Sequence, residues 1–142
     1  MKLWLDTEFN SHGGELISIG LVDEIGNEFY EATHISSDLH PWVQANVMPV
    51  LNIDPISKNV LRIALEEWLV KYPKIHVIAD WPADVAYFCN LLLSDADPGT
   101  RISTPPLTFE VRRDIDSSGS LCLHNAIADA RALRLAYLAV AA

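Results

Sequence analysis

The sequence lacks the features that mark several protein classes. Its two cysteines, Cys89 and Cys122, lie in apolar surroundings without ligand spacing, which argues against a zinc site or a disulfide framework. Lysine and arginine are scarce, 10 against 19 acidic residues, and the net charge of −9 argues against a passive nucleic-acid binder, which presents a basic patch. No apolar run approaches the ~20 residues of a membrane span, and Asp6 interrupts the N-terminal run that a signal peptide needs. We therefore expect a cytoplasmic protein with reduced thiols and no membrane partner.

The composition also indicates the size and assembly of the protein. Its 142 residues suffice for one domain, residues 1–142, with a proper core. Half of the residues are hydrophobic, and the mean hydropathy is slightly positive. This hydrophobic content is high for a small protein and indicates an apolar surface buried between two copies, so we expect a homodimer.

The N-terminal third predicts three antiparallel strands. An apolar run over residues 2–8 predicts the first strand, and residues 10–14 carry strong turn signals. Residues 15–22 predict a second strand, apolar enough to be covered on both faces. A hairpin turn over 23–27 then leads to an alternating third strand over 28–33.

The rest of the chain alternates between helix and strand. Ser57 is a plausible N-cap for a helix whose apolar stripe follows 3.6-residue periodicity, and Pro73 ends it. We expect helices over 41–47, 57–72, 82–94 and 125–140, a loop over 95–106, and short strands over 75–79 and 107–111. This order predicts an α/β fold: a mixed five-stranded sheet, with a three-stranded antiparallel meander plus parallel strands, flanked by helices.

Asp6 and Glu8 stand at the end of the first strand. Residues two apart on a strand point to the same face, so the two carboxylates project together. Buried acids repel each other and lose hydration, and a divalent cation is the usual compensation because hard cations take oxygen ligands. In the alternative interpretation, the strand has reached the surface and both acids are solvated.

Two further acidic stretches lie where a buried strand or loop leads into a helix. Asp80 and Asp84 follow the strand at 75–79, and His124 and Asp129 open the last helix. An acid near a helix N-terminus is favoured in its ionised form by the helix dipole.

In this order and spacing, the three stretches resemble the DEDD superfamily of 3′–5′ exonucleases, in the DEDDh branch with histidine in its third motif. The Asp-x-Glu of the first motif is Asp6 and Glu8, and the His-x₄-Asp of the third is His124 and Asp129. The acid of the second motif is best placed at Asp84. The resemblance covers essentially the whole chain, is closest to the small bacterial exoribonucleases of the mycobacterial type, and implies a ribonuclease H-like fold.

The second motif departs from the family pattern. In the family an asparagine often precedes the motif-two acid by four residues, and Asp80 takes that position here. One of the two acids could cap the helix while the other binds metal. The apolar residues after Asp84 favour Asp84 as the ligand.

The resemblance implies a catalytic role for five side chains. Two ions, Mg²⁺ or Mn²⁺ and about 3.5–4 Å apart, would promote phosphodiester hydrolysis. The implied metal ligands are Asp6, Glu8, Asp84 and Asp129. His124 is the implied general base, since histidine side chains titrate near pH 6.5.

The resemblance also implies how substrate is held. Thr7, Glu8, Phe9 and His124 would contact the terminal nucleotide, with Phe9 against sugar or base. The expected activity is release of mononucleotides from a single-stranded 3′ end, RNA favoured over DNA on size and resemblance. The acidic charge does not exclude a nuclease, because bound metal inverts the local field. Two alternatives stay open: a catalytically inactive ribonuclease H-like binding module, and a hydrolase of small phosphodiesters or dinucleotides.

Other side chains have structural interpretations. We expect Trp42, Trp68 and Trp81 in the core and not as base-stacking platforms, although Trp81 lies near the site, and we expect Leu93 on the inward face of its helix. The histidines other than His124 are expected in loops or strands. Four arginines are expected to be solvated. In the alternative, Arg101 or Arg112 contacts the substrate phosphates. The four arginines expected to be solvated are Arg112, Arg113, Arg131 and Arg134.

Overall fold

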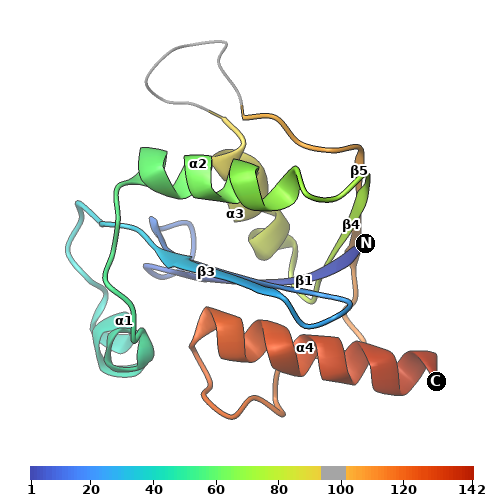
Figure 1. Ribbon diagram of the computed structural model, residues 1–142. Helices are drawn as coiled ribbons and strands as arrows, with labels where there is room; N and C mark the ends of the chain where they lie inside the picture. Colours follow the sequence, from blue (N-terminus) through green and yellow to red (C-terminus); the bar gives the residue numbers. More distant parts are fainter. Residues whose placement is uncertain (94–101) are drawn as a thin grey trace.

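The sheet is built around β1 (Lys2–Phe9), which pairs with two strands of opposite sense. β2 (Leu16–Asp23) is antiparallel to it and β4 (Ile75–Ala79) is parallel. β3 (Glu28–Ala32) and β5 (Leu107–Val111) form the edges, in the order β3-β2-β1-β4-β5. The computed structural model describes residues 1–93 and 102–142, and within them this is a five-stranded mixed sheet (Figure 1). The predicted α/β fold, antiparallel meander and parallel strands are confirmed, and the architecture is consistent with a ribonuclease H-like fold.

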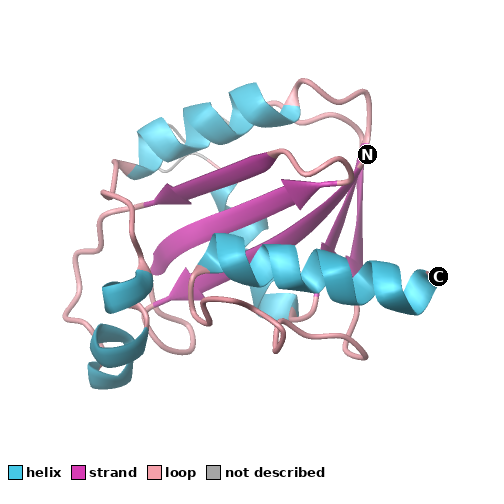
Figure 2. Cartoon of the chain, turned by 60° about the horizontal axis from the view of Figure 1, so that its bottom comes forward, coloured by secondary structure: helices cyan, strands magenta, loops and turns pink. Residues whose placement is uncertain are grey.

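Helices cover both faces of the sheet. α2 (Lys58–Leu69) and α3 (Pro82–Leu91) lie on one face, and α4 (Ala126–Ala141) crosses the other (Figures 1 and 2). α1 (Pro41–Asn46) continues into a short 3₁₀ helix, η1 (Met48–Val50). In the described residues, no helix is long and apolar enough to cross a membrane.

Alternation along β1 decides which side chains meet which helices. Leu3 and Leu5 pack in the large core cluster with side chains of α2 and α3. Trp4 points the other way and contacts Tyr137 of α4, with 5.5 Å between ring centroids. By the same alternation Asp6 and Glu8 face α4, because side chains two apart share a face.

Gly20 lets α4 approach the sheet closely. It lies opposite Asp6 in the β1–β2 pairing, so it points to the same face. A Cβ at Gly20 would lie 2.4 Å from the backbone oxygen of Ala126. Only glycine permits this approach, which brings the first turn of α4 against the acidic end of β1.

Some predicted boundaries and orientations are wrong. α2 ends at Leu69, before Pro73, because a turn follows its C-cap Val70. α3 ends at Leu91, so Leu93 lies beyond it and is 57% exposed instead of inward-facing. Ser94 and the first part of the loop predicted over 95–106 lie outside the described residues.

Candidate active site

A cleft of about 700 Å³ opens beside the carboxyl end of β1. β1 and β4 are parallel, so the carboxyl ends of both strands meet at this edge, where α/β sheets commonly bind ligands. The cleft-lining residues in the described part of the chain include all the side chains predicted for the site. They are Asp6, Thr7, Glu8, Phe9, Ser11, His12, His40, Trp42, Val43, Asp80, Trp81, Ala83, Asp84, Ser117, His124 and Asp129.

One cluster of acids joins β1 to the start of α3. Carboxylate oxygens of Asp6, Asp80 and Asp84 all lie within 4.8 Å of one another. The strand register explains the approach of the first two. Trp4 of β1 lies beside Ile78 of β4, and two further residues along each strand lead to Asp6 and Asp80.

The structure does not assign either acid of the second motif to helix capping. Trp81 occupies the N-cap position of α3, and its side chain makes no capping hydrogen bond. The expectation that one of the two acids caps the helix is therefore wrong, and the assignment of Asp84 as the metal ligand stays a prediction. Asp80 is 6% exposed and Asp84 is 4% exposed, and both carboxylates face Asp6. The sequence signal that could have placed Asp80 at the site is its position directly after the buried strand β4.

Thr7 fixes the orientation of Asp84. Its backbone N–H and its hydroxyl both donate to Oδ1 of Asp84, at 3.1 and 2.6 Å. Thr7 lies between Asp6 and Glu8 on β1, so its side chain points to the opposite face of the sheet, where α3 lies. The predicted contact between Thr7 and a nucleotide stays a prediction, whereas its contact with Asp84 was missed from the sequence.

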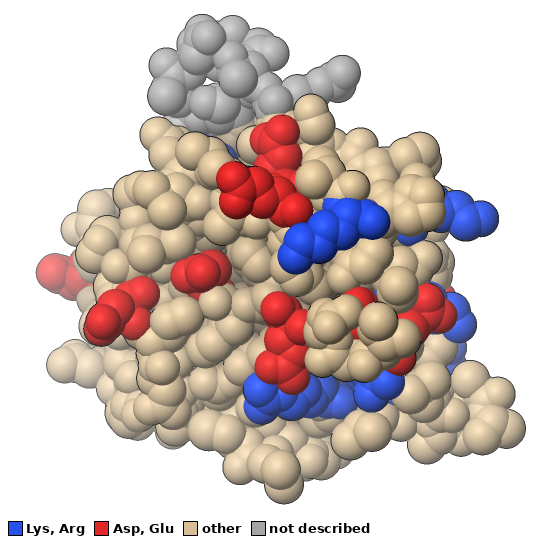
Figure 3. Space-filling view, in the orientation of Figure 1, with Lys and Arg blue, Asp and Glu red and all other residues tan. Residues whose placement is uncertain are grey.

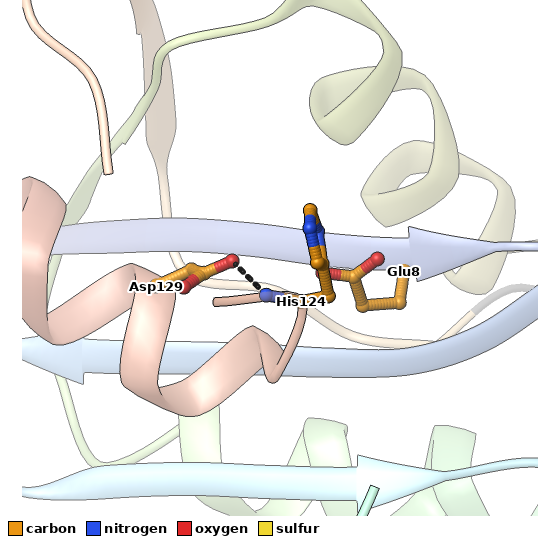
Figure 4. Close-up of side chains that lie close together, drawn as sticks. All are labelled: Glu8, His124 and Asp129. Carbon is orange, nitrogen blue, oxygen red and sulfur yellow. Dashed lines mark hydrogen bonds between the residues drawn. The ribbon is translucent and has the colours of Figure 1, made fainter. Parts of the chain in front are cut away.

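A second cluster joins β1 to the start of α4. Carboxylate oxygens of Glu8 and Asp129 and a ring nitrogen of His124 lie within 4.8 Å of one another (Figure 4). The backbone N–H of His124 donates to Oδ2 of Asp129 at 3.0 Å. This bond holds the Asp129 carboxylate through the His124 backbone and does not involve the ring, which stands between Asp129 and Glu8 in Figure 4.

The chain makes a sharp turn to present His124. The residue has φ +68°, a left-handed conformation that is uncommon outside glycine, although asparagine, aspartate and histidine adopt it more often than other residues do. Asn125 then caps α4, accepting from the backbone N–H of Ala128 at 3.0 Å and donating to the backbone oxygen of Val50 at 2.8 Å. Strain of this kind persists where surrounding bonds enforce it, and it concentrates at functional sites.

Burial makes the ionised acids unfavourable. It raises the pKa of Asp6 well above its ordinary range, and the charges of Asp84 and Glu8 raise it further. Burial, with the charges of Asp129 and Asp84, raises the pKa of Glu8 to about 8. Burial also raises the pKa of Asp84 to about 6, although the Thr7 hydroxyl bond opposes the shift. The fold therefore holds several acids whose charged forms need compensation.

The described residues supply little of that compensation. Burial raises the pKa of Asp80 and of Asp129 as well. Oδ2 of Asp6 and Oδ1 of Asp129 are buried and have no hydrogen-bond partner in the described residues. The cleft-lining residues of that part of the chain include no lysine or arginine. Clusters of carboxylate oxygens that lack hydrogen-bond partners suit a hard divalent cation, so both clusters could hold a metal ion.

Aromatic side chains surround the acids. Phe9 stacks on Tyr87 of α3 with 4.6 Å between ring centroids. Trp68 is buried as predicted, but Trp42 is 50% exposed and Trp81 is 56% exposed, so the core positions predicted for them are wrong. Both side chains line the open cleft instead of packing against the core. Trp42 lies edge-on to His124 at 4.9 Å between centroids.

The arginines expected to be solvated make specific contacts at the surface. Arg131 binds Glu28 at 2.6 and 2.7 Å, and Arg112 binds Asp114 at 2.7 and 2.6 Å. Arg112 does not line the cleft, and Arg101 lies outside the described residues. Acidic and basic side chains are interspersed on the face shown in Figure 3, with no broad basic surface among the described residues there.

Comparison with known proteins gives one consistent result. No family model matches the chain. Two proteins named 3′–5′ exoribonuclease, from Mycobacterium tuberculosis strains CDC 1551 / Oshkosh and ATCC 25618 / H37Rv, are each 31% identical to it over 151 aligned positions. Each alignment covers 92% of this chain and 88% of the relative.

Proposed function

Because this chain belongs to the family of the mycobacterial 3′–5′ exoribonucleases, we propose that it is a metal-dependent 3′–5′ exonuclease of the DEDDh type that favours RNA. The proposal treats residues 1–142 as one exonuclease domain. The observation that carries it is the meeting of all five predicted catalytic side chains at one cleft, in two ligand-capable clusters.

The acids are assigned to metal binding. Asp6 and Asp84, with Asp80, would hold one ion, and Glu8 and Asp129 would contribute to a second. The unpartnered oxygens of Asp6 and Asp129 support this assignment, because each has an open ligand position. Bound Mg²⁺ or Mn²⁺ ions supply charge stabilisation for the phosphoryl group and activation of the attacking water.

His124 is assigned the role of general base. Its ring lines the cleft and is not restrained by the Asp129 bond, which uses the backbone N–H. The edge contact with Trp42 holds one side of the ring. From this position His124 can accept a proton from the attacking water while the acids stay ionised.

Thr7, Glu8, Phe9 and His124 are assigned to the terminal nucleotide. All four line the cleft, and Phe9 is supported from behind by the Tyr87 ring. A homodimer is also part of the proposal. It is supported by exposed apolar side chains in the second half of α4, such as Leu135 at 63% and Val140 at 59%. A monomeric mass at micromolar concentration in solution scattering would exclude it.

The direct test uses 5′-labelled RNA and DNA oligomers of matched sequence, each with a 3′ overhang, in Mg²⁺, Mn²⁺ or EDTA. We expect shortening from the 3′ end with either metal, none in EDTA, and faster loss of RNA. Asp6→Asn should lose hydrolysis with its far-UV circular dichroism unchanged. Asp114→Asn, an exposed acid outside the cleft, is the matched control and should cleave normally. Full activity of Asp6→Asn would overturn the assignment.

A second candidate function is hydrolysis of dinucleotides or other small phosphodiesters. The cleft volume of about 700 Å³ is in the range of small-ligand sites, which favours a short substrate. Comparing kcat/KM for a dinucleotide and for oligomers of increasing length separates the two functions. An inactive binding module is disfavoured because nothing in it would require several buried, uncompensated acids.

A further inference from the structure

Trp81 is an exposed aromatic residue beside the acidic cluster. It immediately follows Asp80, precedes α3 by one residue and lines the cleft. Its exposed fraction of 56% is high for a tryptophan, a residue type that is highly buried on average. A large aromatic surface left open at a cleft is a common feature of ligand sites.

Arg113 covers one face of this ring. Its guanidinium carbon lies 3.2 Å from the ring centroid of Trp81. The same guanidinium donates from Nη1 to the backbone oxygen of Asp80 at 2.9 Å. Arg113 therefore supports the ring from one side and anchors the backbone that carries it, so the exposed area of Trp81 is presented by a fixed side chain.

Shape and charge together match one kind of ligand. A supported aromatic face stacks on a planar ring, and a cation beside it attracts a negatively charged chain. The lining residues in the described part of the cleft include no lysine or arginine, so Arg113 brings positive charge to a rim that otherwise repels phosphates. Single-stranded nucleic acid offers both a planar base and a phosphate backbone.

We propose that Trp81, supported by Arg113, is a stacking platform for an unpaired nucleobase of the substrate strand. This inference rests on the proposed function and deepens it, because it assigns a base-binding subsite to a residue outside the five catalytic side chains. Stacking on tryptophan is tolerant of base identity, so the platform would hold the strand without selecting its sequence.

The test measures binding separately from cleavage. Fluorescence anisotropy of a 5′-labelled RNA oligomer is recorded with Ca²⁺ replacing Mg²⁺, after confirming that the oligomer stays full-length, because Ca²⁺ can occupy acidic ligands with looser geometry. We expect Trp81→Ala to raise the Kd about 5- to 150-fold and Trp81→Phe to raise it much less. Ile63→Ala is the matched control, since Ile63 is 57% exposed on α2 and does not line the cleft.

Abasic substitutions then locate the base. An abasic site is moved along the oligomer one position at a time. At one position, the abasic site should weaken binding to the wild-type protein and leave binding to Trp81→Ala unchanged. The reason is that removing the base and removing the Trp81 ring abolish the same contact. Additive losses at every position would overturn the proposal. So would a change in oligomeric mass of Trp81→Ala without an abasic effect, which would place the ring at an interface between copies.

The same data separate this inference from the proposed function. Cleavage that persists with no coupling between Trp81 and any base would refute the platform and leave the exonuclease intact. Coupled binding without cleavage in Mg²⁺ or Mn²⁺ would support the platform and refute the exonuclease.

Discussion

At the scale of single residues, Asp80 is the acid that most changes the expected chemistry. It is buried against Asp6 and Asp84, and its pKa is raised chiefly by burial. Three acids in one cluster bind a cation strongly but repel one another when the cation is absent. Asp80 therefore favours metal binding and disfavours the metal-free fold.

Asp80→Asn should separate these two effects. The substitution keeps the shape and removes the charge, so we expect a higher Tm in EDTA and a smaller increase in Tm on addition of Mn²⁺. We expect Mn²⁺ affinity to fall about 10- to 100-fold, the usual range for a supporting residue at a metal site. Differential scanning calorimetry and Mn²⁺ titration test both expectations, with Asp114→Asn as the surface control. A lower Tm in EDTA would show that Asp80 stabilises the metal-free fold.

His124→Asn should distinguish a base from a ligand. Asparagine tolerates the left-handed backbone at this position, where φ is +68°, but cannot accept a proton in the working pH range. As a base variant it should lower kcat about 10²- to 10⁴-fold and, at saturating Mn²⁺, remove the acidic limb of the pH–rate profile. Its Mn²⁺ affinity should stay near that of the wild type. A parallel loss of Mn²⁺ affinity would make His124 a ligand, which its distance to Glu8 and Asp129 also permits.

The sequence predicted the site acids better than their neighbours. The spacing of Asp6 and Glu8 was enough to place both carboxylates on one face of β1. It did not reveal that Thr7 donates to Asp84, because that contact joins residues 77 positions apart across a strand and a helix. The exposure of Trp81 was missed for a similar reason, since Arg113, 32 residues later in the chain, supports the ring.

At the scale of elements, the site depends on how closely α4 packs on β2. Gly20 allows the start of α4 to rest on the sheet, and Asp129 lies in the first turn of that helix. The helix predicted over 125–140 is confirmed by α4 (Ala126–Ala141), but its Asn125 cap was not predicted. The close approach could not be predicted, because a single glycine within an apolar strand has several possible causes.

Gly20→Ala should displace the helix from the sheet. The added Cβ would meet backbone atoms of Ala126 and Ile127 at 2.4 to 2.6 Å, and backbone cannot rotate away. We expect a loss of about 1–3 kcal/mol in the free energy of unfolding, with a fall in activity because Asp129 moves relative to Glu8. Denaturant unfolding and the oligomer assay measure the two effects. Gly119→Ala is the matched control, since a Cβ there has nothing within 4 Å. Equal stability of the two variants would refute the packing argument.

At the scale of the whole molecule, the acidic site makes stability depend on pH and metal. The folded-state pKa values of Glu8, about 8, and Asp84, about 6, exceed their ordinary values of 4.5 and 3.8. The metal-free fold therefore favours the protonated acids. Its stability is greatest below the ordinary values and is lost as pH rises through about 6 and about 8.

Metal should reverse this trend. We expect the Tm in EDTA to fall between pH 5 and pH 8, and the increase in Tm caused by Mn²⁺ to grow over the same range, because metal binds the ionised acids. Thermal unfolding at three pH values, with and without Mn²⁺, measures both slopes. Glu8→Gln should flatten the EDTA slope. A Tm in EDTA that rises steadily to pH 8 would contradict the raised pKa values.

Mn²⁺ titration calorimetry measures whether the two clusters bind the metal ions that the proposed hydrolysis needs. Titrations at pH 7 in two buffers of different ionisation enthalpy report both stoichiometry and proton exchange. We expect two saturable ions per chain, with net release of protons because burial keeps some acids protonated before metal binds. The absence of saturable binding by folded protein would contradict this expectation and favour a module that binds nucleic acid without cleaving it.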